Sequence, residues 1–257
     1  MLRSMYASVS SMLTLQSRQS IITNNLANVN TTGYKSQTLV AKSFDDMLLH
    51  NKDSYKNGVS HVNELGALNF GVRIDDTATN YNQGTLISTE NNTDFAIVGS
   101  GFFQVTDEQN NTYYTRDGSF KINPQGYLVT NSGHYVMGTN SQTGNTERIY
   151  VGSDLLNITS DNSIAINGQN RYKFNIVDFE NYDNLNKYGN NLYTGDGGFN
   201  SNNYSIQQKY LEGSNIDYIS EMASMMETVK EFEANQKVIQ TIDSTLAQIA
   251  SEIGRVK

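Results

Sequence analysis

The strongest constraint on the fold is that both ends of the chain carry long apolar stripes at helical spacing. Over residues 1–29 and 215–256, apolar side chains recur at steps of three, four and seven residues, which places them on one face of a helix. The stripe from Asn215 to Ile253 predicts a helix of roughly 58 Å, at about 1.5 Å per residue. Such helices are too long to be buried by the middle of the chain alone. We therefore expect them to pair with each other as a coiled coil and to contact further chains.

The packing positions of the two stripes are the residues that we expect at an assembly interface. In the C-terminal stripe the apolar repeat slips by one place around residues 229–232, which is typical of a stammer-like discontinuity in a coiled coil. The predicted interface residues are Leu15, Ile22, Leu26, Val29, Ile219, Met222, Met226, Val229, Ile239, Ile242, Leu246 and Ile249.

A turn is expected directly after the first helix. Residues 28–33 read Asn-Val-Asn-Thr-Thr-Gly, and these residue types favour local side-chain hydrogen bonds and positive φ over continued helix. Asn30, Thr31, Thr32 and Gly33 are the predicted turn, which also acts as a hinge that sets a direction between the helices and the middle domain. The second helix is expected to begin near Ser214 and Asn215, which are good N-cap residues.

The middle of the chain has the pattern of a β-domain. Two turns are predicted, at residues 123–126 (Asn-Pro-Gln-Gly) and at Asn167-Gly168, which is a two-residue hairpin signal. Residues 181–205 are rich in Asn, Gly and Tyr and are expected to form a loop. Short apolar and β-branched runs predict strands at residues 70–74, 95–98, 102–105, 112–115 and 127–129.

These observations predict an elongated α+β assembly subunit, with a mainly β central domain and long N- and C-terminal α-helices that pair as a coiled coil. A linker or extended segment is expected before the β-domain, in which Phe44, Met47 and Leu48 could form a short helix followed by a polar loop through residues 55–58. The predicted division is residues 1–33 for the first helix and its turn, 34–66 for the linker, 67–210 for the β-rich domain and 211–257 for the second helix.

Composition excludes several classes of function. The chain of 257 residues has no cysteine, which excludes disulfides and thiolate metal sites. Its net charge is −8 and it has no basic stripe, which argues against nucleic-acid binding. No apolar run reaches about 18 residues, so no membrane span is expected. The N-terminus lacks the apolar segment of a secretory signal, so the protein either stays in the cytoplasm or leaves by a route that reads no cleavable signal.

The sequence contains no recognisable catalytic constellation. Gly99-Ser100-Gly101 begins like a dinucleotide loop, but Gln104 stands where the third glycine should be. The three histidines are scattered, and the stretch at residues 194–198 has a single carboxylate, unlike a calcium loop. We therefore predict no enzyme activity, no cofactor and no metal site.

Several blocks together resemble the bacterial flagellar rod and hook proteins. Residues 24–35 (NNLANVNTTGYK) are similar to the N-terminal signature of this family, and residues 211–217 (LEGSNID) and 232–241 (FEANQKVIQT) to its C-terminal helix. Residues 94–103 (DFAIVGSGFF) and 114–120 (YTRDGSF) resemble its β-domain. The chain length and the segment Glu233-Ala234-Asn235 resemble those of the distal rod members of the family.

The resemblance implies a structural role. Subunits of this kind would be exported unfolded by the flagellar type III apparatus, without a cleaved signal, and would polymerise into a helical tube in the basal body. Their terminal helices would form the inner wall around the export channel, and the β-domain would face outward. The tube would transmit motor torque to the hook. The implied partners are copies of the chain itself, other rod and hook proteins and the export apparatus.

Two alternatives stay open at this point. Within the class, the chain could be a hook protein or another rod paralogue. A different class is a secreted adhesin or glycan-binding β-protein, in which the tyrosines of the expected loop stack on sugars: Tyr182, Tyr188, Tyr193 and Tyr204.

Overall fold

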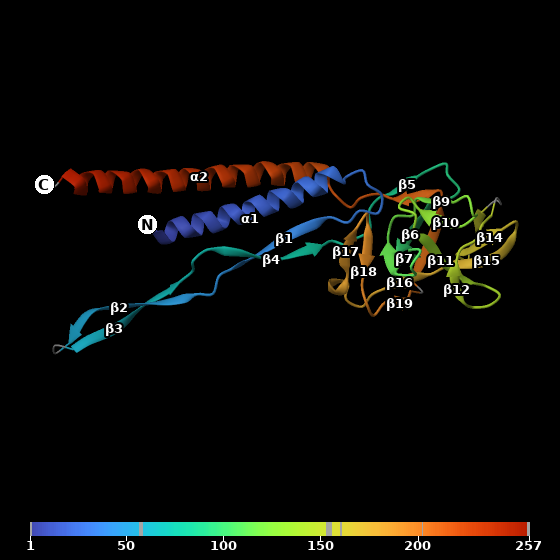
Figure 1. The fold of residues 1–257 in the computed structure, drawn as a ribbon, viewed down its shortest axis with the longest axis horizontal. Coiled ribbons are helices and arrows are strands. Elements are labelled where there is room, and N and C mark those ends of the chain that lie inside the picture. The colour runs from blue at the N-terminus through green and yellow to red at the C-terminus, as the bar shows by residue number, and fades with distance from the viewer. Residues whose placement is uncertain (1, 57–58, 153–155, 160, 202, 256–257) are drawn as a thin grey trace. The chain divides into compact units, whose positions relative to one another are not determined.

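The chain folds into two compact units, described here from a computed structural model (Figure 1). The structure describes residues 2–56, 59–152, 156–159, 161–201 and 203–255. The first unit, here called the helical unit, comprises residues 1–26, 37–80 and 218–257, and the second, here called the β-body, comprises residues 27–36 and 81–217. The chain therefore passes between the units at four points, after Leu26, Ser36, Asn80 and Asp217.

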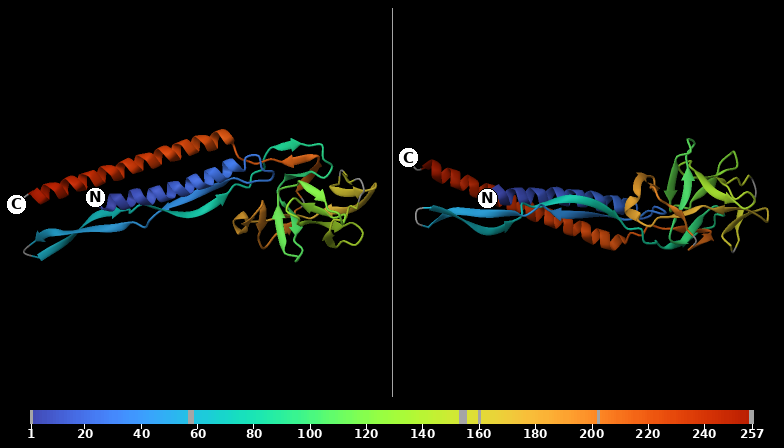
Figure 2. Two further views of the ribbon diagram at one scale, coloured as in Figure 1. Left: turned by 45° about the horizontal axis from the view of Figure 1, so that its top comes forward. Right: turned by 90° about the horizontal axis from the view of Figure 1, so that it is seen from below.

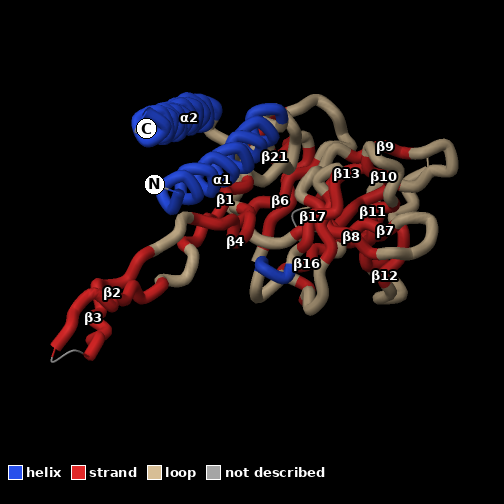
Figure 3. The backbone as a smooth tube through the Cα atoms, turned by 60° about the vertical axis from the view of Figure 1, so that its left-hand side comes forward, coloured by secondary structure: helices blue, strands red, loops and turns tan. Residues whose placement is uncertain are grey.

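The helical unit contains two helices and two antiparallel ribbons. The helices are α1 (Leu2–Ala27) and α2 (Tyr218–Arg255). Strand β1 (Gln37–Ser43) pairs with β4 (Val72–Thr79), and β2 (Met47–Lys56) pairs with β3 (Val59–Leu68). The β2–β3 ribbon continues the one that β1 and β4 begin (Figure 3). Among the described residues, neither helix contains an apolar stretch that is long enough to cross a membrane.

Helix α1 lies along the β1–β4 ribbon (Figure 2) and is tied to both strands. The Val72 amide at the start of β4 donates a hydrogen bond to Ser10 Oγ at 3.3 Å. At the other end of the helix, Asn25 exchanges two hydrogen bonds with the backbone of Gln37, at 2.9 and 3.1 Å. One face of α1 is therefore covered by a ribbon that the apolar stripe did not predict.

The expectation that the terminal helices pair as a coiled coil is wrong. Polar links join the two helices: Asn25 donates to Glu221 at 3.0 Å, Asn235 donates to Ser11 at 3.1 Å, and Arg18 lies 3.9 Å from Glu231. Among the described residues of α2 only Thr228 is buried, whereas Ile219 is 78% exposed and Met226 is 60% exposed. A coiled coil requires apolar side chains of both helices to interdigitate. A periodic stripe shows which face of a helix is apolar but does not identify what covers it.

The β-body is built on a 13-stranded antiparallel sheet with the main path β13-β14-β15-β11-β7-β8-β18-β17. Two further antiparallel pairs, β20–β6 and β21–β5, and a 3₁₀ turn at Tyr182–Asn184 complete it. Its strands are β5 (Leu86–Ser88), β6 (Phe95–Gly99), β7 (Phe102–Thr106), β8 (Thr112–Thr115), β9 (Phe120–Ile122), β10 (Leu128–Thr130), β11 (Tyr135–Asn140), β12 (Thr146–Arg148), β13 (Leu156–Ile158), β14 (Ser163–Ile166), β15 (Gln169–Phe174), β16 (Ile176–Asp178), β17 (Asn186–Gly189), β18 (Leu192–Thr194), β19 (Phe199–Asn200), β20 (Tyr204–Gln208) and β21 (Tyr210–Glu212).

The hydrophobic core of the β-body is aromatic at its centre. Phe103 packs against Phe120 and Phe174, with ring centroids 5.1 and 5.3 Å apart, and Phe95 packs against Phe174 at 5.0 Å. These rings are almost fully buried. Ring pairs at such distances contribute beyond the area that they bury, typically about 0.5–1.5 kcal/mol each.

The structure confirms both predicted turns. The Gly126 amide donates to the Asn123 carbonyl at 2.9 Å, which closes the first turn. Asn167 and Gly168 have φ of 53° and 79° and join β14 to β15. Two successive positive φ values match the twist of a two-residue hairpin.

Two local expectations are wrong. Residues 44–48 form no helix, because Met47 and Leu48 begin β2 and pair with Leu68 and Ala67 of β3. Residues 181–205 contain short strands between their turns, and Asn190 and Asn191, both with positive φ, form the tight turn between β17 and β18. In both cases pairing with a partner strand outweighs local composition. The polar loop expected at residues 55–58 includes 57–58, which lie outside the described residues.

Candidate assembly surfaces

An apolar groove lies on the helical unit where α2 begins. It has a volume of about 540 Å³. Its apolar lining consists of Leu26, Tyr218, Met222, Met225, Met226 and Val229. Three of these side chains are methionines, which are unbranched and adapt to the shape of a partner. The groove is therefore a surface suited to receiving apolar side chains.

The groove unites four of the residues predicted at an assembly interface, Leu26, Met222, Met226 and Val229. The others lie elsewhere. Leu15 and Ile22 are buried, and Val29 belongs to the β-body. Ile219 and Ile249 are exposed, while Ile239, Ile242 and Leu246 are half-buried along α2.

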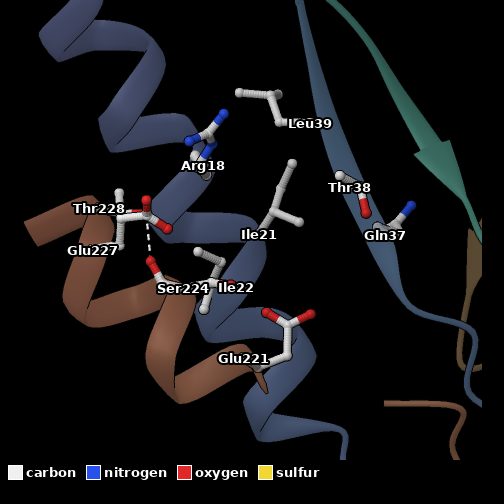
Figure 4. Close-up of a pocket in the computed structure, with 10 residues that line it drawn as sticks. All are labelled: Arg18, Ile21, Ile22, Gln37, Thr38, Leu39, Glu221, Ser224, Glu227 and Thr228. Atoms are coloured by element: carbon white, nitrogen blue, oxygen red, sulfur yellow. Dashed lines mark hydrogen bonds between the residues drawn. The ribbon is translucent and has the colours of Figure 1, made fainter. Parts of the chain in front are cut away.

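A second, more polar cavity of about 230 Å³ lies inside the helical unit (Figure 4). Side chains from α1, β1 and α2 line it, among them Arg18, Ile22, Leu39 and Glu221. Arg18 and Glu227 in this lining are exposed, so the cavity is a cleft that opens to solvent between α1, β1 and α2.

Asn25 is the main polar link beside this cavity. Its side chain is almost fully buried, and its amide nitrogen donates to the Gln37 carbonyl at 2.9 Å and to Glu221 Oε1 at 3.0 Å. Its amide oxygen accepts a hydrogen bond from the Gln37 amide at 3.1 Å. One side chain of α1 is thus bonded to both β1 and α2.

The predicted turn after the first helix is held by the β-body. Helix α1 ends at Ala27, and Gly33 has φ of 67°, as expected for this turn. The Gly33 amide donates to the Glu212 carbonyl at 2.7 Å. Thr32 Oγ1 donates to Asp117 Oδ1 at 2.7 Å, and Asn191 Nδ2 donates to the Thr32 carbonyl at the same distance. The turn is thus bonded to segments before α2, after β8 and before β18.

A buried group of three charged residues, here called the charge triad, lies close to this turn. Lys35 Nζ is 2.6 Å from Glu212 Oε1, and Arg116 Nη1 is 3.1 Å from Glu212 Oε2. The side chains of Lys35 and Glu212 are fully buried, and that of Arg116 is 4% exposed. Burial lowers the pKa of the Lys35 ammonium, and the neighbouring Glu212 carboxylate offsets this only in part.

The charge triad was not predicted from the sequence. A usable signal was present, because each residue falls within a different block that resembles the flagellar proteins: Lys35 in 24–35, Arg116 in 114–120 and Glu212 in 211–217. A charged residue inside an otherwise apolar or turn-forming block is a candidate for a buried ion pair. The pairing itself spans 177 residues from Lys35 to Glu212 and has no local pattern.

The tyrosines of the glycan-binding alternative serve mainly within the β-body. Tyr193 is fully buried, and Tyr182 stacks on Tyr81 with ring centroids 5.0 Å apart. Tyr188 is well exposed and packs one side against Tyr113. These rings do not form one open platform on which a sugar could stack. Over the described residues, no group of three His, Asp or Glu side chains could hold a metal ion.

Three family models match the chain in order. The flagella basal body rod protein model matches residues 5–35, the D1 domain of flagellar hook protein FlgE/F/G matches 96–169, and the C-terminal model of flagellar basal body rod FlgEFG protein matches 207–252. The chain is also 30% identical to flagellar hook-basal body complex protein FlhO of Bacillus subtilis (strain 168), over the full length of both proteins. The chain belongs to the flagellar rod and hook protein family. Lys35, Arg116 and Glu212 each fall within a different one of the three matched regions.

The likeness to a rod protein covers more of both sequences than the likeness to a hook protein. The chain is 32% identical to flagellar basal-body rod protein FlgG of Buchnera aphidicola subsp. Schizaphis graminum (strain Sg), over 97% of this chain and 99% of the relative. It is 40% identical to flagellar hook protein FlgE of Helicobacter pylori, but over 56% of this chain and only 21% of that protein. Likeness over the whole length is thus found with the rod protein.

Proposed function

We propose that this protein is a structural subunit of the bacterial flagellar basal-body rod, close to the distal rod protein. The full-length likeness to a rod protein supports this role, and the family is structural rather than enzymatic. The observation that carries the proposal is the apolar groove at the start of α2, because it gives the subunit an uncovered surface through which to polymerise.

The polymer would be a helical tube. Contacts between unlike patches of identical subunits build open helical filaments when the rotation does not close. In this proposal the terminal helices line the tube around the export channel, the β-body faces outward, and the tube transmits torque from motor to hook. Copies of the chain and other rod and hook proteins are the partners. In this proposal the subunit reaches the basal body through the flagellar type III export apparatus.

The energetics favour this use of α2. Ile219, Met222 and Met226 are 78%, 42% and 60% exposed in the single chain. Burying an apolar side chain of this size contributes about 1.5–3 kcal/mol relative to leaving it in water. Because the three side chains are already partly covered, burying the rest would contribute about 3–5 kcal/mol per subunit, which offsets part of the freedom of movement lost in a polymer contact.

Met226→Asp tests the proposal. The variant should retain the stability of the isolated subunit, because Met226 is exposed, but it should place a charge in the groove and prevent rod assembly. Gln236→Asp is the matched control, since Gln236 is an exposed polar residue of α2. Rod completion would be followed by electron microscopy of basal bodies from cells that carry each variant. Complete rods built from Met226→Asp would contradict the role of the groove.

A further inference from the structure

We propose that Lys35, Arg116 and Glu212 are positioning residues that hold three connecting segments of the β-body in one arrangement before any other subunit binds. The segments are residues 33–36, which follow the first helix, residues 82–85, which follow β4, and residues 212–215, which precede α2. The importance of this arrangement for assembly rests on the function proposed above. The arrangement itself does not.

The Glu212 carboxylate is the centre of the network. Its Oε1 accepts hydrogen bonds from Lys35 Nζ at 2.6 Å and from the Gly84 amide at 2.9 Å. Its Oε2 accepts a hydrogen bond from Arg116 Nη1 at 3.1 Å. Lys35 Nζ also donates to the Asn82 carbonyl at 2.8 Å. A single carboxylate therefore binds both of the other connecting segments and the residue that follows β8.

Hydrogen bonds donated by backbone amides join the same segments in pairs. The Gly33 amide donates to the Glu212 carbonyl at 2.7 Å, and the Gly213 amide donates to the Thr85 carbonyl at 2.8 Å. The Ser36 amide donates to Asn215 Oδ1 at 2.8 Å. With the bond from Lys35 to Asn82, each of the three segments is bonded to the other two. The charge triad is therefore part of a closed network.

The burial of the triad indicates why charges are used here. Replacing a buried ion network with apolar side chains is often neutral or stabilising, so such a network is weak evidence for stability as such. Its main effect is to disfavour competing arrangements of the chain, because a shift of Lys35 or Arg116 away from Glu212 leaves a buried cation without its partner. Lys35 and Arg116 carry two positive charges against one negative charge. The native arrangement is therefore the one in which that single carboxylate reaches both cations.

The experiment compares amide hydrogen exchange in the full-length protein and three variants. Glu212→Gln leaves two uncompensated cations, and Lys35→Met leaves the Arg116–Glu212 pair balanced. The double variant has the same net charge in the triad as the native protein. We expect Glu212→Gln to speed exchange at Gly33 and Gly84 at least about tenfold while the core amide of Ile149, bonded to the Val136 carbonyl, is unchanged.

The double variant distinguishes charge from packing. If the triad positions the segments through charge, removal of Lys35 should reverse part of the effect of Glu212→Gln, so that exchange at Gly33 is slower in the double variant than in the single one. Two independent packing defects would instead add. Glu180→Gln and Lys121→Met are matched controls at exposed positions of the β-body.

Three results would overturn the proposal. The first is unchanged exchange at Gly33 and Gly84 in Glu212→Gln, and the second is an equal increase at Ile149. The third is additive effects in the double variant. If Glu212→Gln does not fold, Lys35→Met decides alone, because it should speed exchange at Gly33 and Ser36 and leave Ile149 unchanged. Exchange is measured on isolated subunits, so its outcome is independent of the rod assembly that Met226→Asp tests.

Discussion

A Cβ atom added to Gly33 would lie 2.5 Å from the amide nitrogen of Asp117. It would also lie 2.7 Å from the Arg116 carbonyl carbon, and Gly33 itself has φ of 67°. Glycine is thus required for two separate reasons, a left-handed backbone and the close approach of another strand end. Because the contacted atoms belong to the backbone, a side chain cannot move aside to relieve the clash.

Gly33→Ala should therefore destabilise the β-body more than positive φ alone explains. The matched control is Gly168→Ala, because Gly168 has φ of 79° but nothing within 4 Å of an added Cβ. We expect Gly168→Ala to lower the free energy of unfolding by about 1–2 kcal/mol and Gly33→Ala by clearly more. Urea denaturation measures both. Equal losses would show that the backbone of residues 116–117 yields to the methyl group.

The stability of the β-body should depend measurably on pH because of Asp178. Burial pushes its pKa up, but hydrogen bonds from Ser100, Tyr182 and the Phe179 amide, with the Arg116 charge, hold the pKa of Asp178 below its ordinary value. The folded-state pKa is thus depressed, so the stabilisation is fully present above the unfolded value of about 3.9 and is lost as pH falls through the folded-state pKa.

Asp178→Asn is the test of this effect. The difference in free energy of unfolding between native protein and variant should be constant from about pH 5 to 8 and should shrink below about pH 4. Asp161→Asn, at an exposed position, should show little difference throughout. Burial, with hydrogen bonding to Asp178, also raises the pKa of Tyr182 to about 12. In the variant, NMR titration should find this pKa lower. A difference in stability that does not shrink at all as pH falls below about 4 would contradict the assignment.

Asn25→Asp should destabilise the helical unit. The substitution removes the two hydrogen bonds that the amide nitrogen donates and places a second carboxylate about 3 Å from Glu221. Leaving buried partners unsatisfied typically costs about 1–3 kcal/mol each, so we expect a loss of at least about 2 kcal/mol at pH 7. The loss should become smaller below about pH 5, where one carboxylate regains a proton and can donate again. Chemical denaturation at both pH values measures it.

The control for this prediction is an exposed amide of the same helix. Gln16 is exposed, so Gln16→Glu introduces the same charge on α1 without entering the buried contact. Surface substitutions of this kind usually change stability by less than about 0.5 kcal/mol. A similar loss in both variants would attribute the effect to charge on α1 in general rather than to the contact with Glu221.

Leu246→Asp and Ile249→Asp should affect assembly and not the isolated subunit. Leu246 is half-buried and Ile249 is 38% exposed, so both charges remain largely hydrated in the single chain. Buried against a neighbouring subunit, either charge would cost several kcal/mol. We expect exported, folded subunits and non-motile cells, with Gln248→Asp as an exposed control on the same helix. Normal swimming of both variants would remove these residues from the proposed interface.

Much of the local structure was predictable from residue pattern. The periodic stripes predicted both helices, and alternating apolar runs predicted strands that match β6, β7 and β8 closely. Asn167-Gly168 and Gly33 were identified from turn chemistry, since few residues other than Gly and Asn adopt positive φ readily. These features depend on residues close in sequence, so the chain itself specifies them.

The pairing of distant segments was not predictable in this way. The same stripe on α2 fits a coiled coil, a ribbon or another subunit, and the predicted partner was wrong. Met47 and Leu48 fit a helix turn until β3 is placed beside them. Lys35, Arg116 and Glu212 are ordinary surface residue types by sequence, and 96 residues separate Arg116 from Glu212. Local pattern reports which side chains avoid water and which backbones can turn. The three-dimensional arrangement determines what covers an apolar face and which buried charges meet, because both depend on contacts whose free energy arises only when distant segments come together.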